Sequence, residues 1–162
     1  MKIYEEASKN SGRISSKFME RRKVKNNLTN EYYVEKDFFV GAYIYISKYI
    51  FKLIECDDFT KKYMIDNCDC FKDSDIYKVI NRIRLEKNNF NSYDEFLVDL
   101  LTKIDEKDEK YVSFDQILNG LKRYNLYLSK QEAVTLEDFI HSIKDSRGLV
   151  SVKGFYEIIR LL

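Results

Sequence analysis

Residues 112–139 read VSFDQILNGLKRYNLYLSKQEAVTLEDF, and this stretch decides the expected fold. Its second half opens with a capping box, because Ser129 and Glu132 can each satisfy an unpaired backbone N–H at a helix start. Apolar residues follow at helical spacing. A similar box, formed by Ser92 and Glu95, precedes the stretch and predicts another helix.

The stretch contains part of an element that occurs twice. The runs 105–116 and 143–154 each follow an apolar helix and open another, and their starts lie 38 residues apart. A β-branched residue stands at the eighth place of each run, Val112 in the first and Val150 in the second. Helix, twelve-residue loop and helix together are the EF-hand unit.

Residues 93–162 therefore resemble a pair of EF-hands, as in calmodulin, myosin light chains and the calmodulin-like domain of calcium-dependent protein kinases. The resemblance implies a short two-stranded contact between the loops, made by Val112 and Val150. Carrying the period backward gives weaker matches at 27–38 and 64–75. The expected fold class is all-α, with four EF-hand-like helix–loop–helix units in two lobes and short β contacts between paired loops.

Three segments are expected along the chain. They are a basic N-terminal segment with a first helix (1–26), a degenerate N-terminal EF-hand-like lobe (27–91) and a C-terminal EF-hand pair (92–162). The apolar run at 38–54, FFVGAYIYISKYIFKLI, is expected to form a mostly buried helix, since it is short and contains two lysines, unlike a membrane span. Further helices are expected over 13–26, 57–65, 74–85, 114–125 and 152–162.

Calcium chemistry fits these loops poorly. Ca²⁺ takes six to eight oxygen ligands, with acids early in the loop, a bidentate Glu at its end and Gly at the sharp turn. In the run 105–116, Lys107 and Lys110 occupy an acidic position and the glycine position, and the last position has only a neutral amide. No cofactor is expected beyond weak Ca²⁺ in this loop. Its candidate ligands are Asp105, Glu109, Tyr111, Ser113 and Gln116.

Composition excludes several classes of protein. The 162 residues include no proline, and 44% are hydrophobic and 34% charged, as in a globular chain. The net charge of +1 gives no overall drive toward nucleic acid. The basic run within 17–25 is interpreted as a solvated helix face or as a site for an acidic partner or lipid headgroups. Three cysteines and one histidine make neither a disulfide framework nor a zinc site, so an intracellular, cytoplasmic location is expected.

Two functions remain. The first is a non-enzymatic, calmodulin-like or light-chain-like module that holds an amphipathic helix of a motor, kinase or scaffold protein, largely without calcium. The alternative is a calcium-responsive regulatory domain of a calcium-dependent kinase. An enzyme is not expected, since the chain has no nucleophile elbow, metal-ligand histidine pair or P-loop. The groove for the partner helix is predicted at Phe96, Leu100, Phe139 and Phe155.

Overall fold

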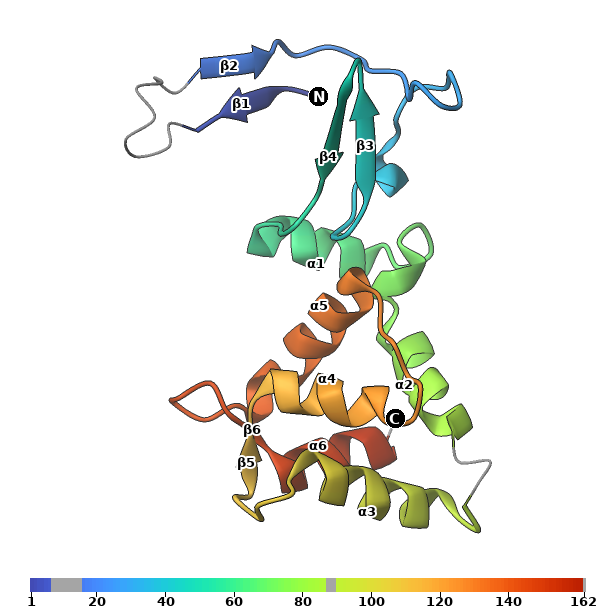
Figure 1. Cartoon of the computed structure of the whole chain (residues 1–162), viewed down its shortest axis with the longest axis vertical. Coiled ribbons are helices and arrows are strands. Elements are labelled where there is room, and N and C mark those ends of the chain that lie inside the picture. The colour runs from blue at the N-terminus through green and yellow to red at the C-terminus, as the bar shows by residue number, and fades with distance from the viewer. Residues whose placement is uncertain (7–15, 87–89, 162) are drawn as a thin grey trace. The chain divides into compact units, whose positions relative to one another are not determined.

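The chain forms two compact units in the computed structural model, which describes residues 1–6, 16–86 and 90–161 (Figure 1). The first unit comprises Met1–Phe38 and Ala42–Leu53, and the second comprises Phe39–Gly41 and Ile54–Leu162. Residues 7–15 of the expected N-terminal segment, with the start of its helix, lie outside the described residues. No helix in the described ranges is long and apolar enough to cross a bilayer.

The first unit consists of two antiparallel hairpins. Strand β1 (Ile3–Glu5) pairs with β2 (Ser16–Met19), and β3 (Tyr43–Ile46) pairs with β4 (Tyr49–Lys52) (Figure 1). A short 3₁₀ turn, Glu35–Asp37, precedes the second hairpin. The fully buried side chains of this small core are Met19, Ile44 and Ile46.

The helices predicted over 13–26 and 38–54 are wrong. Within the second of these segments the chain alternates between an exposed Tyr43 and buried Ile44 and Ile46, which is the period of a strand and not of a helix. Aromatic and β-branched residues favour this extended conformation. Ser47 then supplies the positive φ, 53°, that a tight two-residue hairpin turn requires.

The second unit is helical apart from one small sheet. Its capping serines, Ser92, Ser113 and Ser129, each accept a backbone N–H at the first turn of a helix, as the polar groups at a helix start require. The helices are α1 (Asp58–Asp66), α2 (Ile76–Leu85), α3 (Tyr93–Ile104), α4 (Phe114–Lys122), α5 (Lys130–Phe139) and α6 (Val152–Leu161). Short 3₁₀ segments cover Lys72–Ser74 and Ile140–Ile143.

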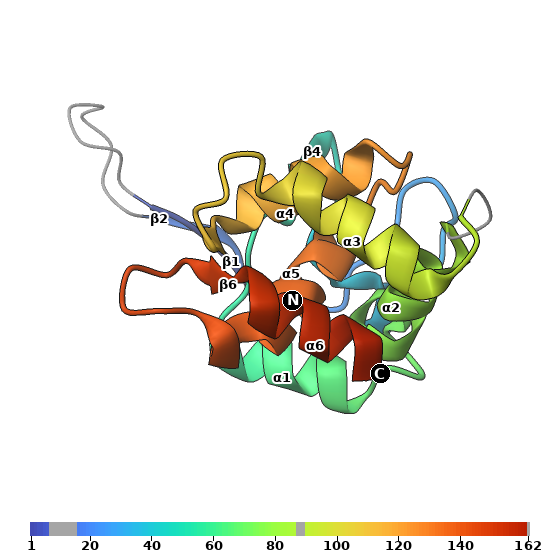
Figure 2. The same ribbon diagram turned by 90° about the horizontal axis from the view of Figure 1, so that it is seen from below.

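Strands β5 (Tyr111–Val112) and β6 (Val150–Ser151) pair antiparallel between the two C-terminal loops. Figure 2 shows α3 and α6 near one another, with β6 leading directly into α6. This arrangement of two helix–loop–helix elements joined by a short sheet matches the part of the expected fold that covers residues 93–162.

The expected all-α fold of four EF-hands in two lobes is contradicted. The described residues combine helices with three small two-stranded sheets. Helix α2 does not belong to a separate lobe, since its Val79, Ile80 and Ile83 share one core with the helices of the C-terminal pair. The run 27–38 forms a turn and a short 3₁₀ segment in place of a helix–loop–helix unit.

Candidate binding groove and loop pair

The loop that follows α3 is closed by its own hydrogen bonds. Asp105 caps the end of α3, and its two carboxylate oxygens accept the backbone N–H groups of Glu109 at 2.8 Å and Lys110 at 2.9 Å. Asp108 and Lys110 adopt positive φ angles of 54° and 64° to make this turn. The carboxylate predicted to be the first calcium ligand is therefore engaged by the backbone of its own loop.

The end of the same loop caps the next helix. The Ser113 hydroxyl accepts the backbone N–H of Gln116 at 3.2 Å, and the Gln116 side-chain oxygen accepts that of Ser113 at 2.8 Å. Two more of the predicted ligand oxygens thus satisfy unpaired N–H groups at the start of α4. Glu109 and Tyr111 are exposed, and Tyr111 lies in β5.

The second loop is closed in a similar way around Asp145. Its carboxylate accepts the backbone N–H groups of Arg147 and Leu149, each at 2.9 Å, and forms an ion pair with the Arg147 guanidinium at 2.8 Å. Partial desolvation acts to raise the pKa of Asp145, but the Leu149 N–H and Arg147 outweigh it and hold the pKa below its usual value. Gly148, with a φ of 77°, makes the turn.

Val112 and Val150, predicted to connect the two loops, lie directly opposite each other in the β5–β6 sheet. Both side chains are fully buried in the core of the second unit. Their pairing sets the register in which Lys110 and Gly148 occupy equivalent turn positions with positive φ.

The donor set of these loops does not fit Ca²⁺. Within the described ranges, no group of three or more His, Cys, Asp or Glu side chains converges as a metal site would require. Lys107 and Lys110 add positive charge to the first loop, and in the second loop Arg147 forms an ion pair with Asp145.

The residues predicted to line the partner groove lie inside the protein. Phe96, Leu100 and Phe155 are fully buried, and Phe139 is partly buried against the same core. Phe96 packs edge-on against Tyr124, with ring centroids 5.2 Å apart. These side chains hold the helices together in this conformation and do not face an open groove.

A different set of side chains lines an open apolar groove of about 550 Å³ beside α3 and α6. Val98 and Leu101 lie three residues apart on α3, and Val152 and Tyr156 lie four apart on α6, so each pair occupies one helix face. Tyr111 of β5 completes the apolar lining, and the charged rim consists of Asp105, Asp108, Lys110 and Lys153.

The sequence did not predict this groove, because the largest apolar residues were taken as its lining and these residues are buried in the core. The signal was present in α3, where Val98 and Leu101 lie outside the buried stripe of Phe96 and Leu100. Val98 is 58% exposed, which is unusual for a branched apolar side chain in the middle of a helix. Apolar residues beyond the width of the core stripe indicate a second contact face.

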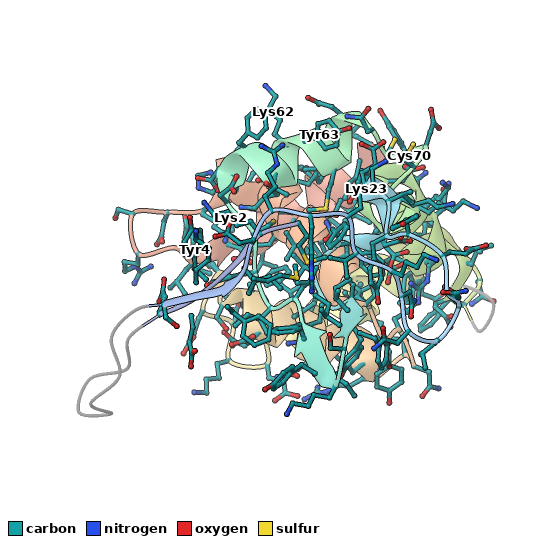
Figure 3. All side chains as sticks on the ribbon, turned by 90° about the horizontal axis from the view of Figure 1, so that it is seen from above. Lys2, Tyr4, Lys23, Lys62, Tyr63 and Cys70 are labelled. Atoms are coloured by element: carbon teal, nitrogen blue, oxygen red, sulfur yellow. The ribbon has the colours of Figure 1, made fainter. Side chains whose placement is uncertain are left out.

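A smaller pocket of about 270 Å³ contains the sole histidine of the chain, His141, together with Cys56. Burial is the main cause that raises the pKa of the Cys56 thiol, so this thiol is not activated as a nucleophile. The pocket's lysines are paired with acids, Lys61 with Asp58 at 3.1 Å and Lys144 with Glu137 at 2.7 Å. The Cys–x–Cys pair at 68 and 70 lies outside this pocket, and Cys70 is exposed (Figure 3).

The basic run within 17–25 lies on β2 and the extended segment after it, not on a helix. Lys17 forms an ion pair with Glu20, while Arg21, Arg22 and Lys23 are exposed. Lys23 is on the same unit as Lys2 and Tyr4 (Figure 3), where the Lys2 ammonium lies 4.6 Å from the Tyr4 ring centroid.

The chain is similar to one known domain family and to a group of known proteins. Residues 1–60 match the model of the DM10 domain. The chain is 27% identical to EF-hand domain-containing family member C2 of Danio rerio in an alignment of length 141 that covers 83% of this chain and 18% of that protein. It is 26% identical to EF-hand domain-containing protein 1 of Mus musculus in an alignment of length 170 that covers 99% of this chain and 25% of that protein.

The human EF-hand domain-containing protein 1 is also 26% identical, over 99% of this chain and 24% of its own length. The chain therefore spans a quarter or less of the relatives described here. These names support the EF-hand part of the resemblance, and the finer likeness to calmodulin or to kinase regulatory domains stays a prediction. The chain is thus similar to EF-hand domain-containing proteins along most of its length, and its first 60 residues match the DM10 domain.

Proposed function

We propose that this chain is a non-enzymatic binding module whose second unit holds an amphipathic helix of a partner protein in the α3–α6 groove, without calcium. The observation that carries the proposal is the open apolar face formed by Val98, Leu101, Val152 and Tyr156. A partner helix with apolar residues at positions i, i+4 and i+7 presents a matching stripe.

The closed loops support independence from calcium. The carboxylates of Asp105 and Asp145 each accept two backbone N–H groups of their own loop, and these hydrogen bonds stabilise the turn. A carboxylate satisfied in this way keeps the loop folded and the β5–β6 sheet in register without a metal. The groove beside α3 and α6 is then open whether or not calcium is present.

The charge of the second unit favours a basic partner helix. Its residues include seventeen Lys and Arg against twenty-one Asp and Glu, a net charge of −4. A basic amphipathic helix would therefore approach this unit with electrostatic attraction and bury its apolar face in the groove. The names of the relatives, EF-hand domain-containing proteins, are consistent with a binding role for this part of the chain.

A synthetic basic amphipathic peptide tests the proposal. We expect the full chain to bind it in EDTA, with amide shifts in α3 and α6. Val98→Asp places a charge in the groove and should weaken binding by about tenfold or more. Phe59→Asp is the matched control, because Phe59 is 81% exposed on α1, outside the groove. Equal weakening of binding in Val98→Asp and Phe59→Asp would contradict the proposal. So would a failure of the unmodified chain to bind the peptide.

A further inference from the structure

The two edges of the β3–β4 hairpin differ in their hydrogen bonding. The N–H of Leu53 donates to the carbonyl of Ala42 at 2.9 Å, which fixes the alternation of bonded and non-bonded pairs along the ladder. Tyr45 and Ile50 lie opposite each other in this ladder as a non-hydrogen-bonded pair. Their backbone N–H and C=O groups therefore point away from each other, toward the two opposite edges of the hairpin. Those of Lys52 likewise point outward from β4.

The outer edge of β3 is closed by a side chain. The Tyr33 hydroxyl accepts the N–H of Tyr45 at 2.7 Å and donates to the Tyr45 carbonyl at 3.4 Å. A single phenol therefore takes the place that a neighbouring strand would occupy on this side.

The outer edge of β4 has no such closure. Within residues 1–6, 16–86 and 90–161, β4 pairs with β3 alone, and no side chain bonds to the outward backbone groups of Ile50 or Lys52. The Ile50 side chain is 63% exposed and that of Tyr49 is 46% exposed. A strand edge of this kind is a template for an added strand.

The core of the first unit is small for its size. Besides its three fully buried side chains, the unit exposes many large apolar ones, and two-stranded hairpins are marginally stable alone. An added strand would supply both backbone partners and apolar cover. The exposed apolar side chains on β4 are Tyr49 and Ile50, and the exposed Phe18 packs edge-on against Tyr49.

Charge indicates what kind of segment fits this edge. Lys48 precedes β4 and Lys52 is its last residue; both are exposed, and each lies within cation–π distance of a tyrosine ring, at 5.5 Å and 5.3 Å. The first unit carries eleven Lys and Arg against six Asp and Glu. A second copy of this hairpin would bring lysines against lysines and be repelled, whereas acidic side chains would be attracted.

We propose that the open edge of β4 binds an extended segment of another protein in which acidic and apolar residues alternate. The segment adds a strand to the hairpin through the backbone of Ile50 and Lys52. Its acidic side chains lie on the face of Lys52 and reach Lys48 and Lys52, and its apolar side chains lie on the opposite face and cover Tyr49 and Phe18. This site lies on the first unit and is independent of the helix groove, so each can fail without the other.

The test uses the full 162-residue chain labelled with ¹⁵N and two synthetic peptides, one alternating Glu with Val and the other alternating Lys with Val. We expect the Glu peptide to shift the amides of Ile50 and Lys52 and the Lys peptide to leave them unchanged. Lys52→Glu should weaken binding of the Glu peptide by about tenfold or more. Lys23→Glu makes the same charge change on an exposed residue outside the hairpin and should weaken it by less than about twofold.

Ile50→Pro supplies a second variant, because it removes one outward N–H without touching the bonds between β3 and β4. Unchanged amide positions for Ile44 and Phe51 would show that the hairpin still folds in this variant, and binding should be lost. Absence of shifts with millimolar Glu peptide would overturn the proposal. Equal weakening by Lys52→Glu and Lys23→Glu would overturn it too, since that result indicates unspecific attraction to the basic unit.

Discussion

The Asp105 carboxylate accepts the backbone N–H of Lys110 at 2.9 Å, in a turn where Lys110 itself has a φ of 64°. The first C-terminal loop therefore keeps the turn of an EF-hand loop while a lysine stands where glycine is favoured. The hydrogen bonds that Asp105 accepts from Glu109 and Lys110 fix this turn.

Lys110→Gly should stabilise the protein by about 1 kcal/mol, because glycine adopts a positive φ without the steric cost that a side chain brings. Gly148→Ala tests the equivalent turn in the opposite direction, and it should destabilise by about 1 kcal/mol through strain alone, since no atom lies within 4 Å of the added methyl group. Urea unfolding of both variants measures the two changes. A destabilised Lys110→Gly would mean that the lysine side chain has a contact that outweighs its strain.

Gly120 of α4 packs against Ile104 of α3. A methyl group at this position would lie 2.3 Å from Cγ1 of Ile104, which is buried. We expect Gly120→Ala to destabilise by about 2 kcal/mol, because overpacking outweighs the better helix propensity of alanine. In the double variant with Ile104→Val most of the loss should remain, because valine lacks only Cδ1, 3.3 Å from the added methyl group, and keeps the clashing γ carbon. Thermal unfolding without a change in midpoint would show that the two helices separate more easily than this packing allows.

Tyr33→Phe should expose the backbone of Tyr45 to exchange. The phenol hydroxyl is the partner of both backbone groups of Tyr45, so its loss leaves a donor and an acceptor unpaired at about 1 kcal/mol or more. Hydrogen exchange at the Tyr45 amide should become faster. Tyr32→Phe is the control, because Tyr32 is 54% exposed, and it should leave this exchange rate unchanged. Equal rates in both variants would contradict the assigned closure of the β3 edge.

Asp99 should make stability depend on acid. Its hydrogen bonds with Lys103, and then with Tyr124, hold the pKa of this carboxyl below its usual value. The ionised form is favoured in the folded state, so the stabilisation is complete above the unfolded pKa of about 3.9 and is lost as the pH falls through the lower folded pKa. Unfolding curves of Asp99→Asn and the original chain should differ at neutral pH and converge in strong acid. A constant difference across this range would exclude the ionic contribution.

The C-terminal pair was readable from sequence because local signals and long-range pairing agree there. The boxes at Ser92 and Ser129 begin helices, and the spacing of Val112 and Val150 places them opposite each other. The helix expected over 38–54 was wrong because an apolar run with two lysines four residues apart fits a helix as well as a strand. The alternation at Tyr43 to Ile46 was the better signal.

The groove could not be located from sequence for a different reason. The sequence shows which residues of a helix are apolar, but packing decides which of them are buried in the core. Phe96 and Phe155 fill the interior, and the smaller Val98 and Val152 line the groove.

We propose that the second unit binds a helix without calcium. Calorimetric titration of the basic amphipathic peptide into the full chain, once in EDTA and once in millimolar Ca²⁺, measures this calcium dependence. We expect the same dissociation constant in both buffers within about twofold, corresponding to less than about 0.5 kcal/mol of coupling. Binding that occurs only with Ca²⁺ would contradict it.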